Sequence, residues 1–149
     1  MAETKTKFTK VSVKNFIASV PNETRRKDAE VLLKLFAKVT GWKAQMFGPT
    51  IVGFGRYDYT YDSGHSGYAC VVGFSPRSAN LVIYGGMMAS GEKAAPFLAK
   101  LGKHKISKGC LYINKLADVD LGQLEKMLNA GTANAKKAFT EKGWRVSGT

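Results

Sequence analysis

The spacing of the apolar residues changes from a helical period to an alternating one at Gly48-Pro49, and this change constrains the fold more than any other feature. Before it, apolar side chains recur three or four residues apart, which is typical of amphipathic helices. After it come three segments rich in β-branched and aromatic residues: 50–61, 67–74 and 80–86. The connections between them, DSGHSG and SPRSA, are too short for parallel strands, whose crossover needs about a dozen residues or more. We therefore predict antiparallel hairpins.

Two helices are expected ahead of the strands, because capping residues bracket both apolar stripes. A first helix begins after Ser12 and stops at Pro21. A second is capped by Asn22 or Thr24 and ends at Gly41. Its polar face is rich in lysine and arginine and is most simply interpreted as solvated.

The later part of the chain adds a helix, a strand and a helix. Residues 90–102 place apolar side chains on one helical face, and 110–115 form an apolar strand. Asp120 with Gln123 resembles a capping box for the last helix, which Gly131 either ends or loosens. The order α-α-β-β-β-α-β-α predicts an α+β fold: a two-layer sandwich whose antiparallel sheet of about four strands is covered by helices on one face.

The length and the termini predict one domain in the cytoplasm. A chain of 149 residues falls within the usual size of a single domain. We expect 1–10 to be a flexible basic arm and 11–149 to be the domain, with a basic helical tail from about 130. We expect no signal peptide and no membrane span. Cys70 and Cys110 lie in apolar runs, which favours buried thiols in a reducing compartment.

The charge is strongly positive and unevenly distributed. Lysine and arginine number 23 against 11 acidic residues, for a formal net charge of +12. A surface this basic favours acidic partners such as nucleic acid, anionic lipid or an acidic protein. Residues 45–90 are neutral overall, so the excess lies on the arm, the second helix and the loop GKHK. The strands carry aromatic side chains, and the lysines surround them in sequence.

No pattern in the sequence predicts a metal, a cofactor or a catalytic centre. The two histidines, His65 and His104, are 39 residues apart, and the one close grouping is Asp58, Asp62 and His65. Its spacing indicates a polar hairpin tip rather than a metal site. Neither cysteine has a neighbouring base, and no phosphate-binding glycine motif occurs. We therefore predict a protein that is not an enzyme.

The face on which the tyrosines lie depends on two glycines. Val52 and Phe54 share one phase of the first strand. The tyrosines take the other phase: Tyr57, Tyr59 and Tyr61. A bulge at Gly53 or Gly55 would bring them to the face of Phe54. Without a bulge they would form an exposed aromatic surface.

The hypothesis that follows is a binding protein whose contact surface is the sheet face and the hairpin. Arginines and lysines would supply charge-assisted hydrogen bonds to an acidic or polar partner, and tyrosines would supply flat contact area. The candidate residues are Arg56, Tyr57, Tyr59, Tyr61, His65 and Arg77, bordered by Lys103 and His104. The alternative is nucleic-acid binding through the lysine-rich helix and arm.

Three stretches resemble the YdhG-like family, a group of small bacterial proteins of unknown function that has been compared with frataxin. They are RRKDAEVLLKLFAKVTGWKAQMFGPTIVGFGRYDYTYDSG, GFSPRSANLVIY and LAKLGKHKISKGCLYINKLADVDLGQLEKML, which together cover about 11–128. The resemblance implies a compact two-layer α/β fold, a cytoplasmic location and no established catalytic residues. Some members are described as frataxin-like iron chaperones, which is a further alternative, although the basic long helix here would repel iron cations.

Overall fold

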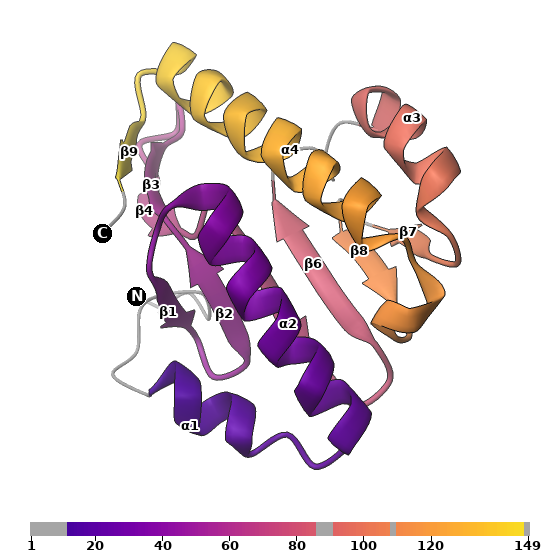
Figure 1. The fold of residues 1–149 in the computed structure, drawn as a ribbon. Coiled ribbons are helices and arrows are strands. Elements are labelled where there is room, and N and C mark those ends of the chain that lie inside the picture. Colours follow the sequence, from indigo (N-terminus) through magenta and orange to yellow (C-terminus); the bar gives the residue numbers. More distant parts are fainter. Residues whose placement is uncertain (1–11, 86–90, 108–109, 148–149) are drawn as a thin grey trace.

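The computed structural model describes residues 12–85, 91–107 and 110–147, and its elements follow the expected order with additional strands (Figure 1). The predicted arm at 1–10 lies outside the described residues. The helices are α1 (Val13–Ala18), α2 (Glu23–Thr40), α3 (Gly91–Leu101) and α4 (Leu121–Glu141), with a 3₁₀ turn, η2 (Leu116–Asp118). The strands are β1 (Ala44–Phe47), β2 (Ile51–Phe54), β3 (Arg56–Thr60), β4 (Ser66–Ala69), β5 (Val72–Pro76), β6 (Leu81–Gly85), β7 (Lys105–Ser107), β8 (Cys110–Ile113) and β9 (Arg145–Ser147).

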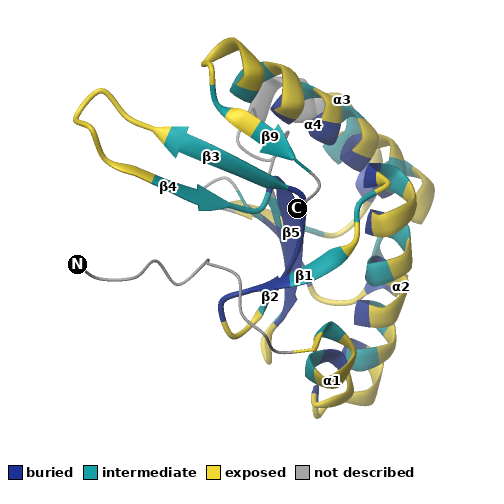
Figure 2. Cartoon of the chain, turned by 90° about the vertical axis from the view of Figure 1, so that its left-hand side faces the viewer, coloured by how far each residue is buried: buried dark blue, intermediate teal, exposed yellow. Residues whose placement is uncertain are grey.

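The fold is α+β with antiparallel sheets, as predicted, but its strands form two sheets. In the described part of the chain, one sheet has six strands in the order β1-β2-β5-β6-β8-β7 and the other three in the order β4-β3-β9. The helices lie together on one side of the larger sheet, and the hairpin of β3 and β4 projects away from it (Figure 2). The structure therefore differs from the predicted single sheet of about four strands.

Capping residues set the helix ends where the sequence places them. The side chain of Ser12 accepts a hydrogen bond from the Asn15 amide, and Asn22 does the same at the start of α2. Gly41 ends α2 with a φ of 72°, in the left-handed region that glycine adopts without a steric cost. The α4 helix continues through Gly131 to Glu141. The predicted caps are confirmed, and Gly131 does not end the last helix.

The core lies between the larger sheet and the helices. Phe36 of α2 contacts Phe54 of β2 and Phe74 of β5, with ring centroids 5.4 Å and 5.3 Å apart. All three are almost completely buried. Ile83 and Leu111 continue the same helix-facing row across β6 and β8. Alternate residues of these strands therefore face away from the helices.

One long hairpin joins the two sheets. In the larger sheet Phe54 pairs with Val72, and in the smaller sheet Tyr57 pairs with Ala69. Three positions separate the pairs on each strand, so neither strand contains an inserted residue. The ladder breaks at Gly55, whose φ is 74°. This kink, rather than a bulge with an extra residue, brings Tyr57 to the core on which Phe54 lies.

Among the described residues, no helix combines the length and the apolar character that crossing a bilayer requires.

Candidate functional site

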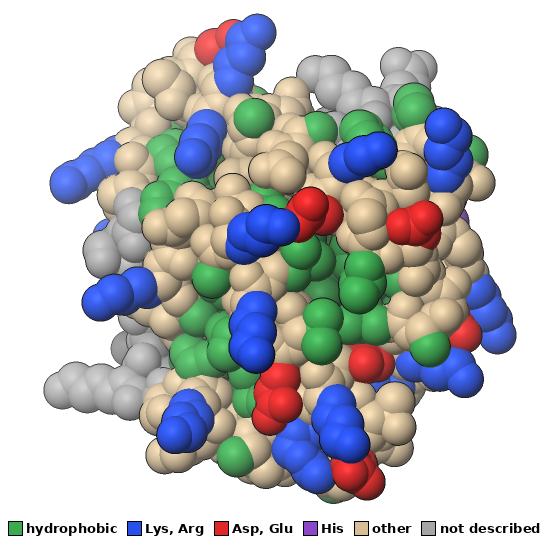
Figure 3. All heavy atoms as spheres, viewed as in Figure 1, with side chains coloured by type: hydrophobic (Ala, Val, Ile, Leu, Met, Phe, Trp, Pro, Cys, Tyr) green, Lys and Arg blue, Asp and Glu red, His purple; other side chains and the backbone are tan. Residues whose placement is uncertain are grey.

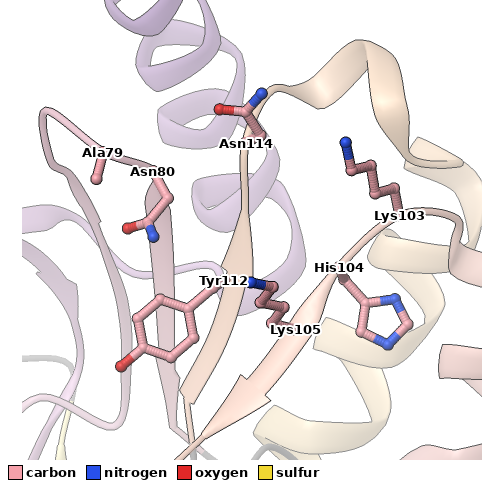
Figure 4. Close-up of a pocket in the computed structure, with 7 residues that line it drawn as sticks. All are labelled: Ala79, Asn80, Lys103, His104, Lys105, Tyr112 and Asn114. Carbon is pink, nitrogen blue, oxygen red and sulfur yellow. The ribbon is translucent and has the colours of Figure 1, made fainter.

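A basic hollow opens at the end of the larger sheet where β6 begins and β8 ends (Figure 4). Its volume is about 400 Å³. The described lining residues offer hydrogen-bond donors and include no carboxylate: Ala79, Asn80, Lys103, His104, Lys105, Tyr112 and Asn114. We call this region the basic end. Positive charge without a neighbouring carboxylate is suited to binding an anionic group.

Strand pairing positions the hollow on the sheet face opposite the helices. Lys105 pairs with Tyr112 across β7 and β8, and Tyr112 pairs with Val82 across β8 and β6. Paired residues point to the same face, so the Lys105 ammonium group and the Tyr112 ring lie beside each other, as Figure 4 shows. Asn80 and Asn114 flank the last pair of β6 and β8 and form the opposite wall.

The loop that carries Lys103 and His104 is held in place by backbone contacts. Gly102 forms an isolated bridge with Val119, and the amide of Lys103 donates to the Asp118 carbonyl at 3.2 Å. The Nδ1 atom of His104 lies 2.7 Å from the Gly102 carbonyl oxygen. A carbonyl only accepts hydrogen bonds, so Nδ1 carries the proton and Nε2 is the atom left for a ligand.

Arg25 belongs to this end of the molecule, which the sequence analysis missed. Only 8% of Arg25 is exposed. Its Nη1 group donates to the carbonyl of Arg77, and Nη2 donates to the carbonyl of Asn114 at 2.9 Å. The guanidinium therefore ties the start of α2 to the turn after β5 and to the end of β8. It also borders a second, smaller hollow of about 170 Å³.

A signal for Arg25 was present in the sequence. Arg25 precedes Ala29 by four residues and Leu32 by seven, so it continues the buried stripe of α2. A basic residue in phase with core residues must find partners for its charge.

Arg77 lies in the same region but points toward a tyrosine. Its Nη2 group donates to the Tyr84 hydroxyl at 2.6 Å. Burial raises the pKa of Tyr84, although the positive charge of Arg77 opposes that shift. Arg77 follows β5, whereas the tyrosine hairpin precedes it. The predicted contact residues therefore fall at opposite ends of one strand.

The tyrosines gather in an aromatic cluster with two residues from the C-terminal part of the chain. Tyr57 stacks on Phe139 of α4 with centroids 4.0 Å apart. Tyr59 and Tyr61 lie 5.1 Å apart, and each contacts Trp144. Exposure increases outward along the strand, from a half-buried Tyr57 to Tyr61 at 51%. We call this group, with His65 at its rim, the aromatic tip.

Arg56 lies apart from both groups. It donates to Asp58 at 2.7 Å and 3.0 Å, and its guanidinium lies 3.9 Å above the ring of Tyr68. Arg56 and Asp58 alternate with the tyrosines along β3, so they face the other side of the smaller sheet. The structure thus brings together Lys103 with His104, and the tyrosines with His65, but not the whole predicted surface.

On the helix-covered face, the described lysines and arginines do not form a continuous basic stripe. Figure 3 shows its lysine and arginine side chains separated by acidic, apolar and uncharged ones. Lys27 pairs with Glu23 at 3.2 Å and Lys38 with Glu125 at 2.9 Å. Exposed pairs of this kind reduce the field that a nucleic acid would encounter on α2.

The part of the chain that the structure describes contains no group of three or more histidine, cysteine or acidic residues that could hold a metal ion.

Comparison of the chain with protein-family models, with curated proteins and with solved structures gave no match.

Proposed function

We propose that this protein is a non-enzymatic binding domain of YdhG-like type that recognises an acidic group on a partner through its basic end. The observation that carries this proposal is the hollow formed by Lys103, Lys105 and His104 with no carboxylate among its described lining residues. Two carboxamides and a phenol add neutral hydrogen-bonding groups. These groups favour an anion with several acceptor oxygens, such as a carboxylate or a phosphate, over a monatomic anion.

The rigidity of the basic end supports recognition. The Lys103–His104 loop is fixed by its contacts with Asp118 and Val119, and Arg25 holds Asn114 from beneath. A site whose walls are already in place loses less conformational freedom on binding. The buried charge of Arg25 also adds to the positive field at this end.

The chemistry of the neighbouring thiol supports a role in binding rather than in catalysis. Cys110 lies on the same sheet face as Tyr112, two residues before it. Burial raises the pKa of the Cys110 thiol, although Arg77 opposes that shift. A raised pKa disfavours the thiolate that a nucleophilic mechanism needs.

A cytoplasmic location is part of the same proposal. Neither Cys70 nor Cys110 forms a disulfide, which is usual in a reducing compartment.

Titration with an acidic peptide tests the proposal. Hexaglutamate is added to ¹⁵N-labelled protein, with hexaglutamine as the uncharged control. We expect the amide signals of 103–105 and of Tyr112 to shift most. The double variant Lys103→Gln/Lys105→Gln should weaken binding about fivefold, since each exposed charge pair contributes about 0.5 kcal/mol.

The matched control removes two lysines elsewhere. Lys34 on α2 and Lys126 on α4 are both exposed, and the variant Lys34→Gln/Lys126→Gln has the same net charge as the test variant. It should bind hexaglutamate almost as the parent does. Equal losses in the two variants, or shifts centred on α2, would show that only net charge matters and that the basic end is not the site.

A further inference from the structure

The aromatic tip presents flat ring faces to solvent in a fixed arrangement. At 51% exposure, Tyr61 is the most exposed of the large apolar side chains in the described part of the chain. Its ring is nearly parallel to that of His65, at 11° and a centroid distance of 6.0 Å. Trp144 meets Tyr61 edge-on at the same distance. Such a group offers several surfaces on which another planar ring could stack.

Hydrogen bonds fix Trp144 in this position. Its indole Nε1 donates to the carbonyl of Thr60 at 3.1 Å, and its backbone amide donates to the carbonyl of Phe139 at 2.9 Å. The β9 strand that follows pairs with β3. These contacts therefore hold Trp144 against the smaller sheet, although it lies more than 80 residues from the tyrosine strand in sequence.

Folding also brings a lysine to these rings, a residue type that the tyrosine strand itself lacks. The Nζ atom of Lys142 lies 4.6 Å from the centroid of the Trp144 ring. The same end of α4 carries Lys137 and Glu141, whereas the Nζ atom of Lys136 lies over the ring of Trp42, 4.6 Å from its centroid. None of these lysines was predicted near the tyrosines, because they lie in the last helix or directly after it.

A shallow hollow connects the rings to the charge. Its volume is about 320 Å³, and its described lining residues are Thr60, Tyr61, Asp62, Lys142 and Trp144. A volume in this range accommodates a single planar base. Asp62 on one rim repels phosphate, so a nucleic-acid backbone would follow the Lys142 side.

We propose that the aromatic tip binds single-stranded nucleic acid, with bases stacked on Tyr61 and Trp144 and a backbone phosphate paired with Lys142. Exposed aromatic rings beside positive charge are the features by which proteins bind single strands without sequence preference. A duplex has its bases already stacked, so the rings would gain nothing from it. This site and this ligand are separate from the acidic-group recognition proposed for the basic end.

Fluorescence titration with a short oligonucleotide tests the placement. The chain has two tryptophans, Trp42 and Trp144, so the variant Trp42→Phe leaves Trp144 as the reporter. Twelve-residue oligothymidylate should quench its emission at about 20 mM salt. With the one phosphate contact at Lys142, raising salt to about 200 mM should weaken binding about fivefold. A duplex of the same length should bind more weakly.

Single variants locate the contact by anisotropy of a labelled oligonucleotide. Tyr61→Ala should weaken binding about tenfold, because stacking on one ring contributes about 1–3 kcal/mol per base. Lys142→Gln should weaken it and reduce the salt dependence. Tyr68→Ala is the matched control for the tyrosine, since Tyr68 lies on the opposite face of the same hairpin. Lys34→Gln is the control for the lysine.

Four results would overturn the proposal. They are an absence of binding at low salt, unchanged Trp144 emission while anisotropy rises, control variants that lose as much affinity as Tyr61→Ala, and a duplex bound as tightly as the single strand. Thermal unfolding of each variant checks that the loss of binding is not a loss of fold.

Discussion

The two halves of the long hairpin have the same register but opposite roles. In the inner half, β2 and β5, the side chains of Phe54 and Phe74 are almost completely buried, and both contact Phe36 of α2. In the outer half, β3 and β4, the side chains are at most half-buried and become exposed toward the turn. Hairpin pairing alone therefore does not place residues in a core. The kink at Gly55 and the helices above the inner half do so.

Removal of a ring from each half should show the largest contrast. Phe54→Ala should lower the free energy of unfolding by about 4 kcal/mol, because it leaves a cavity between β2 and α2. Tyr61→Ala should lower it by less than about 1 kcal/mol, because half of that side chain already contacts water. Urea unfolding measures both. Similar losses would mean that the outer half is as much a part of the core as the inner half.

A side chain at the kink should have the next largest effect. Gly55→Ala should cost about 3 kcal/mol, because the φ of 74° strains any other residue and a Cβ there would overlap the Trp42 ring. Gly64→Ala is the matched control in the same hairpin. Gly64 also has a positive φ, 89°, but an added Cβ there meets no atom within 4 Å, so about 1 kcal/mol is expected. Equal costs in urea unfolding would show that Trp42 does not define the kink.

A substitution of Arg25 tests whether the stability of the inner half depends on a buried charge at its end. Arg25→Met should lower the free energy of unfolding by about 2 kcal/mol, because the carbonyls of Arg77 and Asn114 lose their donors. Lys34→Met, on the exposed side of the same helix, should change it by less than about 0.5 kcal/mol. If the two variants unfold at the same urea concentration, the guanidinium contacts contribute nothing measurable.

Cys70 lies at the junction of the two halves. Its thiol should have a smaller effect on the free energy of unfolding, and this effect depends on pH. Burial raises the pKa of its thiol from 9.0 to about 12. The folded protein therefore holds this proton more tightly than the unfolded chain does. The resulting stabilisation is complete below pH 9.0 and is lost as the pH rises toward about 12. Between pH 8 and pH 10 the parent should lose roughly 1 kcal/mol more than Cys70→Ala does. Parallel curves for the two proteins would contradict a buried thiol at this position.

The sequence was sufficient for the elements that carry their own local signal. Ser12, Asn22 and Asp120 cap helices because their side chains accept from amides three residues later, and this geometry depends on neighbours in the chain. The inner strands were likewise visible in their β-branched and aromatic residues. These elements required no knowledge of distant contacts.

The remaining features depend on contacts between distant segments. The β9 strand has three residues and is defined by pairing with β3, so no local pattern indicates it. The β1 strand follows α2 closely and is defined by its ladder with β2. Trp144 reaches the tyrosines because β9, which follows it, pairs with β3. The predicted site lacked Trp144 for this reason. Arg25 differs, because its helical phase could be predicted from the sequence, whereas its hydrogen-bond partners could not.

Hydrogen exchange of the backbone amides along the hairpin tests most directly whether its two halves are distinct parts of the molecule. Amides of β2 and β5 that form ladder hydrogen bonds should exchange only through global unfolding. The paired amides of β3 and β4 should exchange through a smaller opening, at rates at least tenfold faster and with little dependence on denaturant. Equal protection in both halves, with the same denaturant dependence, would contradict the division of this hairpin into a core and an aromatic tip.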